Sequence, residues 1–395
     1  MRPGSRLALA VVIIGAAVVL SSRNGEAHKP ITSPYTFNED VYPIVRERCG
    51  SCHYGGGVAP MSLMTHAEAV PWGESIRAEL MAGHMPPWRI ESAATRFRNV
   101  QGLSARELNV LLTWASGGTP PGDPEKAPAI APAERRWPLG VPDLELRLPE
   151  DVTVPSSVQE QVSEFVVPTG LDTARGIRAV DLLPGTPAIV RSATVSVRMA
   201  DATSAESRSV ERLAALWLPG DHPIPLDAGA AFELPAGASL IVRVRYRKTW
   251  EYENRAVSDR SSVGLYFADG PATPVEALAL AGEAKAGETA AIVSRTITEP
   301  MRVVAIYPDP DFVDAAVQVV AIRPDASRDE LIAFRPHAGW ARRYWFRESI
   351  VLPRGTRIEA RATFGTALLP PSALATRPQP EQGRVRLTLN VLRGT

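Results

Sequence analysis

The chain has 395 residues, with 43 Lys and Arg against 43 Asp and Glu, so its formal net charge is zero. This balance gives no long-range attraction to nucleic acid, and a composition with 45% hydrophobic and 22% charged residues is too polar for a protein with many membrane spans. Two Cys allow at most one disulfide, which excludes a disulfide-rich scaffold, and the length predicts two or three domains.

Residues 1–27 have the pattern of a secretory signal peptide. Two arginines precede an uncharged run of 14 residues, 7–20, and the small residues Gly25 and Ala27 stand at positions −3 and −1 of a cleavage site. Because a membrane span needs about 20 apolar residues, we expect export to the periplasm with removal of the leader. The alternative is an uncleaved N-terminus that anchors the exported protein to a membrane.

Residues 35–117 have helical spacing. Val41, Ile44 and Val45 fall on one helical face. Ser104 followed by Glu107 forms a capping box ahead of a second helical repeat. We therefore expect a small all-α domain over 35–122. A Pro- and Ala-rich linker is predicted to follow it over 123–136.

Short segments rich in Val and Ile replace the helical pattern after Trp137. Several of them alternate apolar and polar residues, and Pro or Gly separates them, which is typical of antiparallel β-sandwiches. The remaining length exceeds that of one sandwich. We expect one all-β domain over 137–270 and a second over 285–395, so the predicted fold is multidomain, all-α and then all-β.

The strongest chemical motif is Cys49-Gly50-Ser51-Cys52-His53. Residues three apart share one face of a helical turn, so both sulfurs can reach the two vinyl groups of one haem. The next residue, His53, can then bind the iron as the proximal ligand. A CxxCH run is the signature of c-type haem attachment, and it predicts one covalent haem c on Cys49 and Cys52.

Other uses of a CxxC pair fit the sequence less well. A structural zinc site needs two further Cys or His ligands, and the chain has no other Cys. A thioredoxin-like dithiol belongs at a βα junction, whereas the surrounding pattern is helical. A plain CxxC disulfide is a further alternative.

The sixth iron ligand is predicted to be Met85. It begins Met85-Pro86-Pro87-Trp88, where two prolines with fixed φ stiffen an extended loop. Thioether ligation gives a low-spin centre of relatively high potential. His84 and Met61 remain alternatives.

Residues 35–122 resemble a class I-type cytochrome c domain. The resemblance lies in the CxxCH motif, the Met85-Pro86-Pro87-Trp88 loop and the closing helical run 103–120. In that family the Met of such a loop is the usual distal ligand, which implies the same role for Met85.

Residues 137–395 resemble the two-domain, ascorbate-dependent type II copper monooxygenases, the class of peptidylglycine and dopamine β-hydroxylases. The resemblance implies a pair of β-sandwich domains with one copper in each. The matching landmarks, in order, are Trp137-Pro138-Leu139-Gly140, Leu183-Pro184-Gly185, Leu218-Pro219-Gly220, Leu234-Pro235-Ala236-Gly237, Asp259-Arg260-Ser261-Ser262 and Leu352-Pro353-Arg354-Gly355.

The residues that would bind copper are missing from this chain. The His-His pair of the first copper is replaced by Arg191-Ser192, and its third ligand by Arg245. The motif of the second copper reads Pro308-Asp309-Pro310-Asp311. After residue 100 only His222 and His337 remain, too few for two imidazole-based copper sites. We therefore expect the β domains to hold no copper.

The sequence thus predicts an exported mono-haem electron-transfer protein or redox subunit that serves periplasmic redox partner proteins and binds no nucleic acid. Its β domains would have docking or structural roles, and we expect no enzyme activity of their own. One alternative is a haem-fed copper monooxygenase, and another is a haem-based sensor.

Overall fold

The computed structural model describes residues 32–87, 89–92, 94–100, 102–129, 136–198, 211–284, 288–310, 315–336, 339–364 and 384–393. The predicted signal peptide or anchor therefore lies outside the described residues, as does part of the expected linker. Within the described residues, no helix is both long and apolar enough to cross a membrane.

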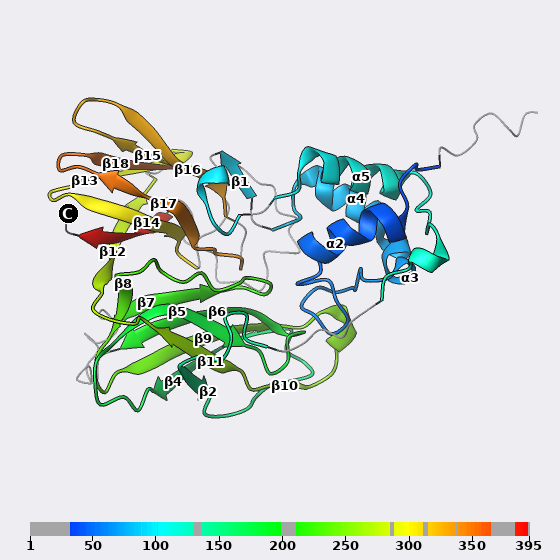
Figure 1. Cartoon of the computed structure of the whole chain (residues 1–395), viewed down its shortest axis with the longest axis horizontal. Helices are drawn as coiled ribbons and strands as arrows, with labels where there is room; N and C mark the ends of the chain where they lie inside the picture. The colour runs from blue at the N-terminus through cyan, green and yellow to red at the C-terminus, as the bar shows by residue number, and fades with distance from the viewer. Residues whose placement is uncertain are drawn as a thin grey trace, which may run out of the picture.

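Helices occupy the N-terminal part of the described chain and form a cluster beside the β-sheets (Figure 1). Their shared core contains Phe37, Val41, Leu111 and Trp114, all nearly fully buried. The helical elements are η1 (Phe37–Val41), α2 (Tyr42–Arg48), α3 (His66–Ala69), η2 (Val70–Trp72), α4 (Gly73–Ala82), η3 (Ala94–Arg96), α5 (Ala105–Ser116), η4 (Pro124–Lys126) and η6 (Trp250–Tyr252).

The helix α5 begins at the capping box that the sequence predicts. The Ser104 side chain accepts from the Glu107 amide at 3.2 Å, and Glu107 Oε2 accepts from the Ser104 amide at 2.7 Å. Both bonds satisfy amides that the first turn leaves without an intrahelical partner. The Glu107 side chain also accepts from Arg48 Nε at 3.0 Å, which ties α5 to the end of α2.

The prediction of a separate small all-α domain is wrong. The chain between α4 and α5 leaves the helices as strand β1 (Arg89–Ser92), which pairs antiparallel with β16 (Arg328–Arg335). Phe97 is fully buried in the apolar core of the C-terminal sheets and forms a backbone bridge to Phe346. The described part of the chain is mostly β, with several sheets and short helices, and no independent helical domain is evident in it.

The reason for this error lies in residues 89–100. Without β1, β16 would be the edge strand of its sheet and would have unpaired amide and carbonyl groups. Pairing with β1 satisfies these groups. Phe97 follows the short helix η3 directly and forms a single bridge to Phe346, with its side chain in the C-terminal core. The interpretation of 35–122 as one helical unit could not anticipate these contacts with distant strands.

The β-strands form two layered units that share one long sheet. A four-stranded sheet has the order β4-β9-β6-β7, an eight-stranded sheet β17-β14-β19-β12-β8-β5-β11-β2, and a five-stranded sheet β1-β16-β15-β18-β13, with β10-β3 as a small separate pair. The strands are β2 (Leu144–Arg147), β3 (Val152–Val154), β4 (Glu160–Pro168), β5 (Arg175–Leu183), β6 (Val190–Arg198), β7 (Arg212–Trp217), β8 (Ala230–Leu234), β9 (Ser239–Arg247), β10 (Val257–Asp259), β11 (Ser262–Phe267), β12 (Thr273–Glu283), β13 (Ala290–Thr296), β14 (Met301–Pro308), β15 (Ala315–Ile322), β17 (Tyr344–Leu352), β18 (Arg357–Phe364) and β19 (Arg384–Arg393).

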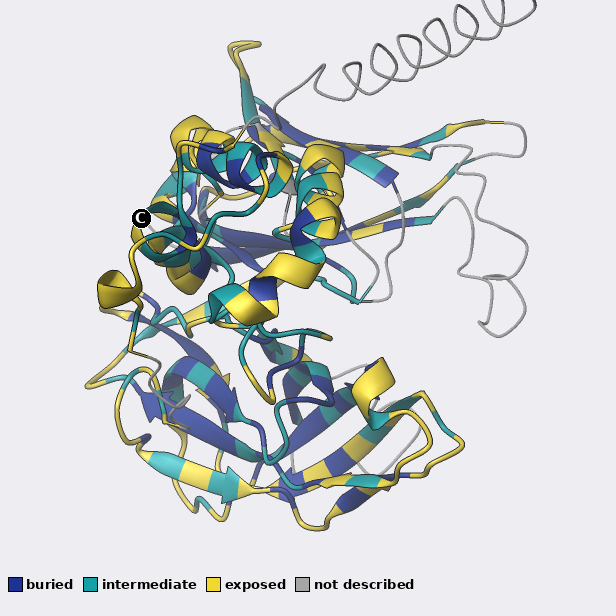
Figure 2. Ribbon diagram, turned by 90° about the vertical axis from the view of Figure 1, so that its right-hand side faces the viewer, coloured by how far each residue is buried: buried dark blue, intermediate teal, exposed yellow. Residues whose placement is uncertain are grey.

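Two apolar cores lie between these sheets. The first is built from residues between Leu148 and Phe267 with Leu392, and the second from residues between Leu278 and Val391 with Phe97. Among the described strands, pairing is antiparallel except where β12 joins β8 in parallel at Thr273 and Pro274. Buried positions follow the strands, and exposed positions dominate the outer surfaces of the helices (Figure 2).

Candidate functional site: the CxxCH turn and the loop that covers it

The CxxCH motif forms one tight turn at the end of α2. The Cys49 amide donates to the carbonyl of Val45 at 2.9 Å, and the amides of Cys52 and His53 both donate to the carbonyl of Cys49, at 3.0 and 2.9 Å. A Cβ added at Gly50 would lie 2.4 Å from the Arg46 carbonyl oxygen, so the turn needs glycine there. Both cysteines and His53 are thus held on a single turn.

The His53 ring is oriented by a backbone carbonyl. Its Nδ1 lies 3.2 Å from the carbonyl oxygen of Met61, and the Leu63 amide donates to the His53 carbonyl at 3.0 Å. With the proton on Nδ1, the ring donates to Met61 and keeps the Nε2 lone pair for a metal. Burial lowers the pKa of His53, which favours the neutral form that ligates iron.

Both cysteines are free thiols in the structure. Burial raises the pKa of Cys49 to about 12 and that of Cys52 to about 11. A redox dithiol needs at least one thiolate stabilised near neutral pH, so these thiols lack the environment of a thioredoxin-like nucleophile.

Apolar side chains lie beside the thiols of this turn. Cys49 and Met61 pack against the apolar core of the helices, which provides a hydrophobic wall beside the thiols. Apolar side chains that a porphyrin could cover also lie exposed on the following segment: Val70, Met81 and Met85. The two thiols and the oriented imidazole are the groups that a covalently attached haem would need. Among the described residues, no group of three or more His, Cys, Asp or Glu side chains is placed so that it could hold a metal ion.

The three candidates for the sixth ligand have different surroundings. Met85 lies in the loop after α4 and is 41% exposed. Met61 packs against the helical core, and its carbonyl already accepts from His53. His84 is exposed, and its Nδ1 lies 3.0 Å from Glu79 Oε2. Within the part of the chain that the structure describes, no hydrogen bond or ion pair engages the Met85 side chain, so Met85 stays the predicted ligand. Trp88 lies outside the described residues.

A loop of the first β unit covers the motif, a contact that no sequence pattern indicated. The Cys52 thiol lies 3.5 Å from the carbonyl oxygen of Pro219, to which it donates. Gly220 approaches so closely that a Cβ there would lie 2.4 Å from Ser51 Oγ, and its φ of 77° suits glycine. Arg191, on β6, donates to the carbonyl of Val58 in the loop that follows the motif.

Two positions where the resemblance would place ligands of the first copper lie together. Ser192 on β6 is the direct cross-strand partner of Arg245 on β9, and both line a cleft of about 480 Å³ that Pro310 also borders. Arg245 Nη1 donates to Glu160 at 2.7 Å. The structure thus brings together the residues that the monooxygenase resemblance placed at one site. Asp311 and His337 lie outside the described residues.

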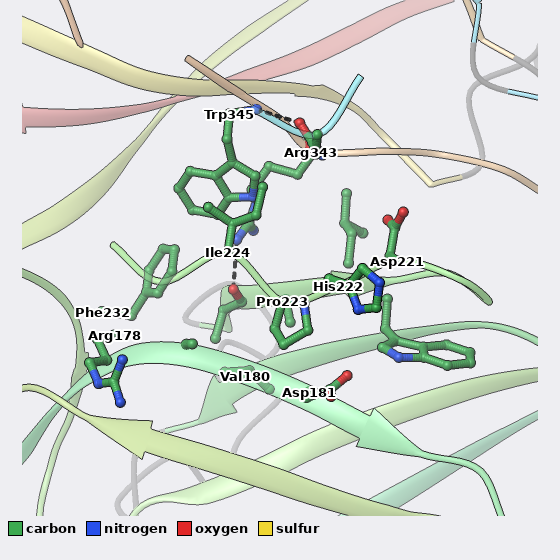
Figure 3. Close-up of a pocket in the computed structure, with 16 residues that line it drawn as sticks. Arg178, Val180, Asp181, Asp221, His222, Pro223, Ile224, Phe232, Arg343 and Trp345 are labelled. Carbon is green, nitrogen blue, oxygen red and sulfur yellow. Dashed lines mark hydrogen bonds between the residues drawn. The ribbon is translucent and has the colours of Figure 1, made fainter. Parts of the chain in front are cut away.

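A second, smaller pocket is lined by residues of both β units, with Asp181 on one side, Arg343 and Trp345 opposite, and His222 and Asp221 between them (Figure 3). The Arg343 guanidinium is buried, donates to the carbonyls of Ala214 and Leu213, and lies over three aromatic rings. Burial raises the pKa of the Asp181 carboxyl to about 6.

Comparisons with known proteins add little to this site. No family model matches the chain, and no curated protein matches it. Solved structures with some similarity include a Paenibacillus xanthan lyase (10% identity, 68% of this chain and 28% of that chain, TM-score 0.18) and the allantoicase of Saccharomyces cerevisiae (9%, 58% and 76%, TM-score 0.17). The chain therefore spans little more than a quarter of the lyase. Scores this low do not establish a common fold.

Proposed function

We propose that this chain is an exported, mono-haem c-type electron-transfer protein or redox subunit. The observation that carries the proposal is the CxxCH turn itself, in which Cys49 and Cys52 share one helical turn and His53 is held by the Met61 carbonyl with Nε2 left for iron. The resemblance of residues 35–122 to cytochrome c sequences supports the same conclusion. It is a resemblance of motifs, because the helical segment is not a separate domain.

Each residue of the turn has a definite role in this proposal. Cys49 and Cys52 would hold the haem through two thioether bonds, each made by addition of a thiol across a vinyl group, which needs no oxidant or reductant. His53 would bind the iron through Nε2, and Met85 is the predicted second ligand. When bound, haem c would supply a one-electron iron centre. The hydrogen bonds of the turn would hold the haem in place, which would keep the reorganisation on electron transfer small.

In this proposal the β units bind no copper and have a docking or structural role. The contacts of Pro219 and Gly220 with the motif support a structural role. Arg191 and Arg245 stand where copper ligands would be needed, and their charge would repel a cation. The exchange partner is proposed to be a periplasmic redox protein, with the N-terminal segment serving as a cleaved leader or as a membrane anchor.

The second candidate function is a haem-fed copper monooxygenase. Its support is the cleft that Ser192, Arg245 and Pro310 line together, in the place where the resemblance puts the copper sites. A haem-based sensor is a third candidate, which needs a weak or absent sixth ligand.

One experiment separates these candidates. The full chain is expressed in a periplasm that matures c-type cytochromes, and its pyridine haemochrome spectrum is combined with elemental analysis. One iron and no copper per chain, with a low-spin spectrum insensitive to CO, is expected. Stoichiometric copper would favour the monooxygenase, and an immediate spectral shift on adding CO to the ferrous protein would favour the sensor. The absence of covalent haem would refute the proposal.

A matched pair of histidine variants tests the ligand assignment. His53→Ala should keep covalent haem, because both cysteines remain, but should lose the low-spin spectrum. His84→Ala, an exposed histidine in the loop after α4, should leave the spectrum unchanged. The reverse result would move the iron ligand from His53 to His84.

A further inference from the structure

A tight turn of the first β unit, residues 218–221, lies over the second attachment cysteine, and we call it the strap. Leu218 is buried, and the Asp221 amide donates to the Leu218 carbonyl at 3.1 Å, so a hydrogen bond of its own closes the strap. The strap directly follows β7, an edge strand of the four-stranded sheet. It is therefore part of the first β unit, although it lies against the turn at the end of α2.

The strap leaves little space beside the Cys52 sulfur. The carbonyl oxygen of Pro219 lies 3.5 Å from Cys52 Sγ and accepts from the thiol. A Cβ added at Gly220 would lie 3.3 Å from the same sulfur, 2.8 Å from Ser51 Cβ and 2.4 Å from Ser51 Oγ. Even one methyl group at Gly220 does not fit, so the backbone of the strap and the CxxCH turn are in close contact.

A second contact joins the same β unit to the chain that follows the motif. Arg191 on β6 donates to the carbonyl of Val58. The amide of the next residue, Ala59, donates to the Cys52 carbonyl at 3.2 Å. Cys49 differs, because it packs against the apolar core of the helices. The β unit therefore contacts Cys52 and the residues around it, whereas the helices surround Cys49.

We propose that the strap controls when Cys52 can be modified: haem is added to Cys52 while the strap is open, before the first β unit docks on the turn. This inference rests on the proposed function. In the addition, a sulfur–carbon bond forms, the thiol hydrogen moves to the other carbon of a vinyl group, and no oxidant or reductant is needed. The closed strap opposes this step, because it accepts the hydrogen bond of the thiol and because its backbone covers one side of the sulfur.

The test measures how fast each thiol of the haem-free full chain reacts with fluorescein maleimide, a bulky reagent, and with the smaller iodoacetamide. The chain is produced in a cytoplasm that does not attach haem. Cys49→Ala leaves Cys52 as the only thiol, and Cys52→Ala leaves Cys49. Because the bulky reagent reaches only molecules with an open strap, the rate with fluorescein maleimide relative to iodoacetamide should be about tenfold lower at Cys52 in the native chain than in the unfolded chain.

A matched pair of glycine variants tests the strap itself. Gly220→Ala should open it, because the new methyl group meets Ser51 and the φ of 77° is strained for alanine. We expect Cys52 to react with fluorescein maleimide about tenfold faster in this variant, with Cys49 unchanged. Gly229→Ala is the control, since its φ is 83° in the same β unit but a Cβ there meets nothing within 4 Å. It should change neither rate. Adding Ser51→Gly to Gly220→Ala removes the clash and should restore part of the protection.

The outcomes separate this inference from the proposed function. A Cys52 rate in Gly220→Ala that does not exceed the rate in Gly229→Ala would overturn the inference, and so would an equal rise at Cys49, which would mean that the whole turn has loosened. If Gly220→Ala does not fold, the wild-type chain decides: an equal ratio of the two reagent rates at Cys52 in the native and unfolded chains contradicts the strap. None of these results involves haem, so the proposed function would stand. A periplasmic chain without covalent haem would instead refute the proposed function, while the thiol rates still decide whether the strap covers Cys52.

Discussion

Replacing Phe97 by Ala should destabilise the C-terminal β unit, although Phe97 belongs to the segment between two helices. Phe97 is fully buried, and its ring lies 4.8 Å from that of Phe346 and 5.8 Å from that of Tyr344. Removal of a buried Phe side chain costs about 3–5 kcal/mol. The two ring contacts place the expected loss in the free energy of unfolding near the upper end of that range, at about 4–5 kcal/mol.

The assay is hydrogen exchange of the native full chain, because unfolding of a protein with several units is not expected to be a single two-state step. Amides of β16 and β17 should exchange faster in Phe97→Ala, while those of β4 and β9 in the first unit should not change. Val351→Ala is the matched control: Val351 lies on β17 but is 61% exposed, so a change within about 0.5 kcal/mol is expected. Unchanged protection of β16 and β17 in Phe97→Ala would refute the view that the N-terminal segment is part of the C-terminal core.

Three further predictions concern a buried carboxyl, a buried hydrogen bond and the distal ligand. Because the folded pKa of Asp181 is raised to about 6, the native state binds more protons than the unfolded state between pH 4 and 6, and stability should fall with rising pH there by up to about 3 kcal/mol. Asp181→Asn should remove this slope, followed by native-state hydrogen exchange of β5. Tyr246→Phe loses the hydroxyl that donates to Asp259 at 3.1 Å, so we expect a loss of about 1–3 kcal/mol in the protection of β9 amides, and no loss would mean that the bond contributes nothing. Met85→Ala should lower the haem potential and give a high-spin spectrum, whereas an unchanged spectrum would direct attention to Met61 or His84.

Local signals in the sequence predicted the parts of the site that lie close together along the chain. The CxxCH spacing places Cys49, Cys52 and His53 on one turn because the geometry of a helical turn depends only on neighbouring residues. The Ser104 and Glu107 capping box was predictable for the same reason, and the structure confirms it.

Contacts between distant segments were not predictable in this way. The pairing of β1 with β16 joins residues more than 200 positions apart. The four residues of β1 are too few to show a strand period beside the stronger helical pattern on either side. The contact of Gly220 with Ser51 left no trace beyond a Pro-Gly dipeptide, which is also the ordinary signature of a turn.

The structure gives Arg191 a role that the sequence did not show. The resemblance to copper monooxygenases placed this arginine where a histidine ligand would be expected. In the structure it donates to the carbonyl of Val58, and burial lowers its pKa to about 10. Its position therefore has a structural explanation: it fastens β6 to the loop that follows the CxxCH turn, which a histidine is too short to do in the same way.

The mass of the intact protein under denaturing conditions tests the central claim most directly. The full chain is purified from a periplasm that matures c-type cytochromes, unfolded, and treated with a thiol-alkylating reagent before its mass is measured. The account predicts that the mass of one haem remains attached and that neither Cys49 nor Cys52 is alkylated, whereas Cys49→Ala/Cys52→Ala carries no covalent haem. A wild-type chain without added haem mass, and with both cysteines alkylated, would contradict it.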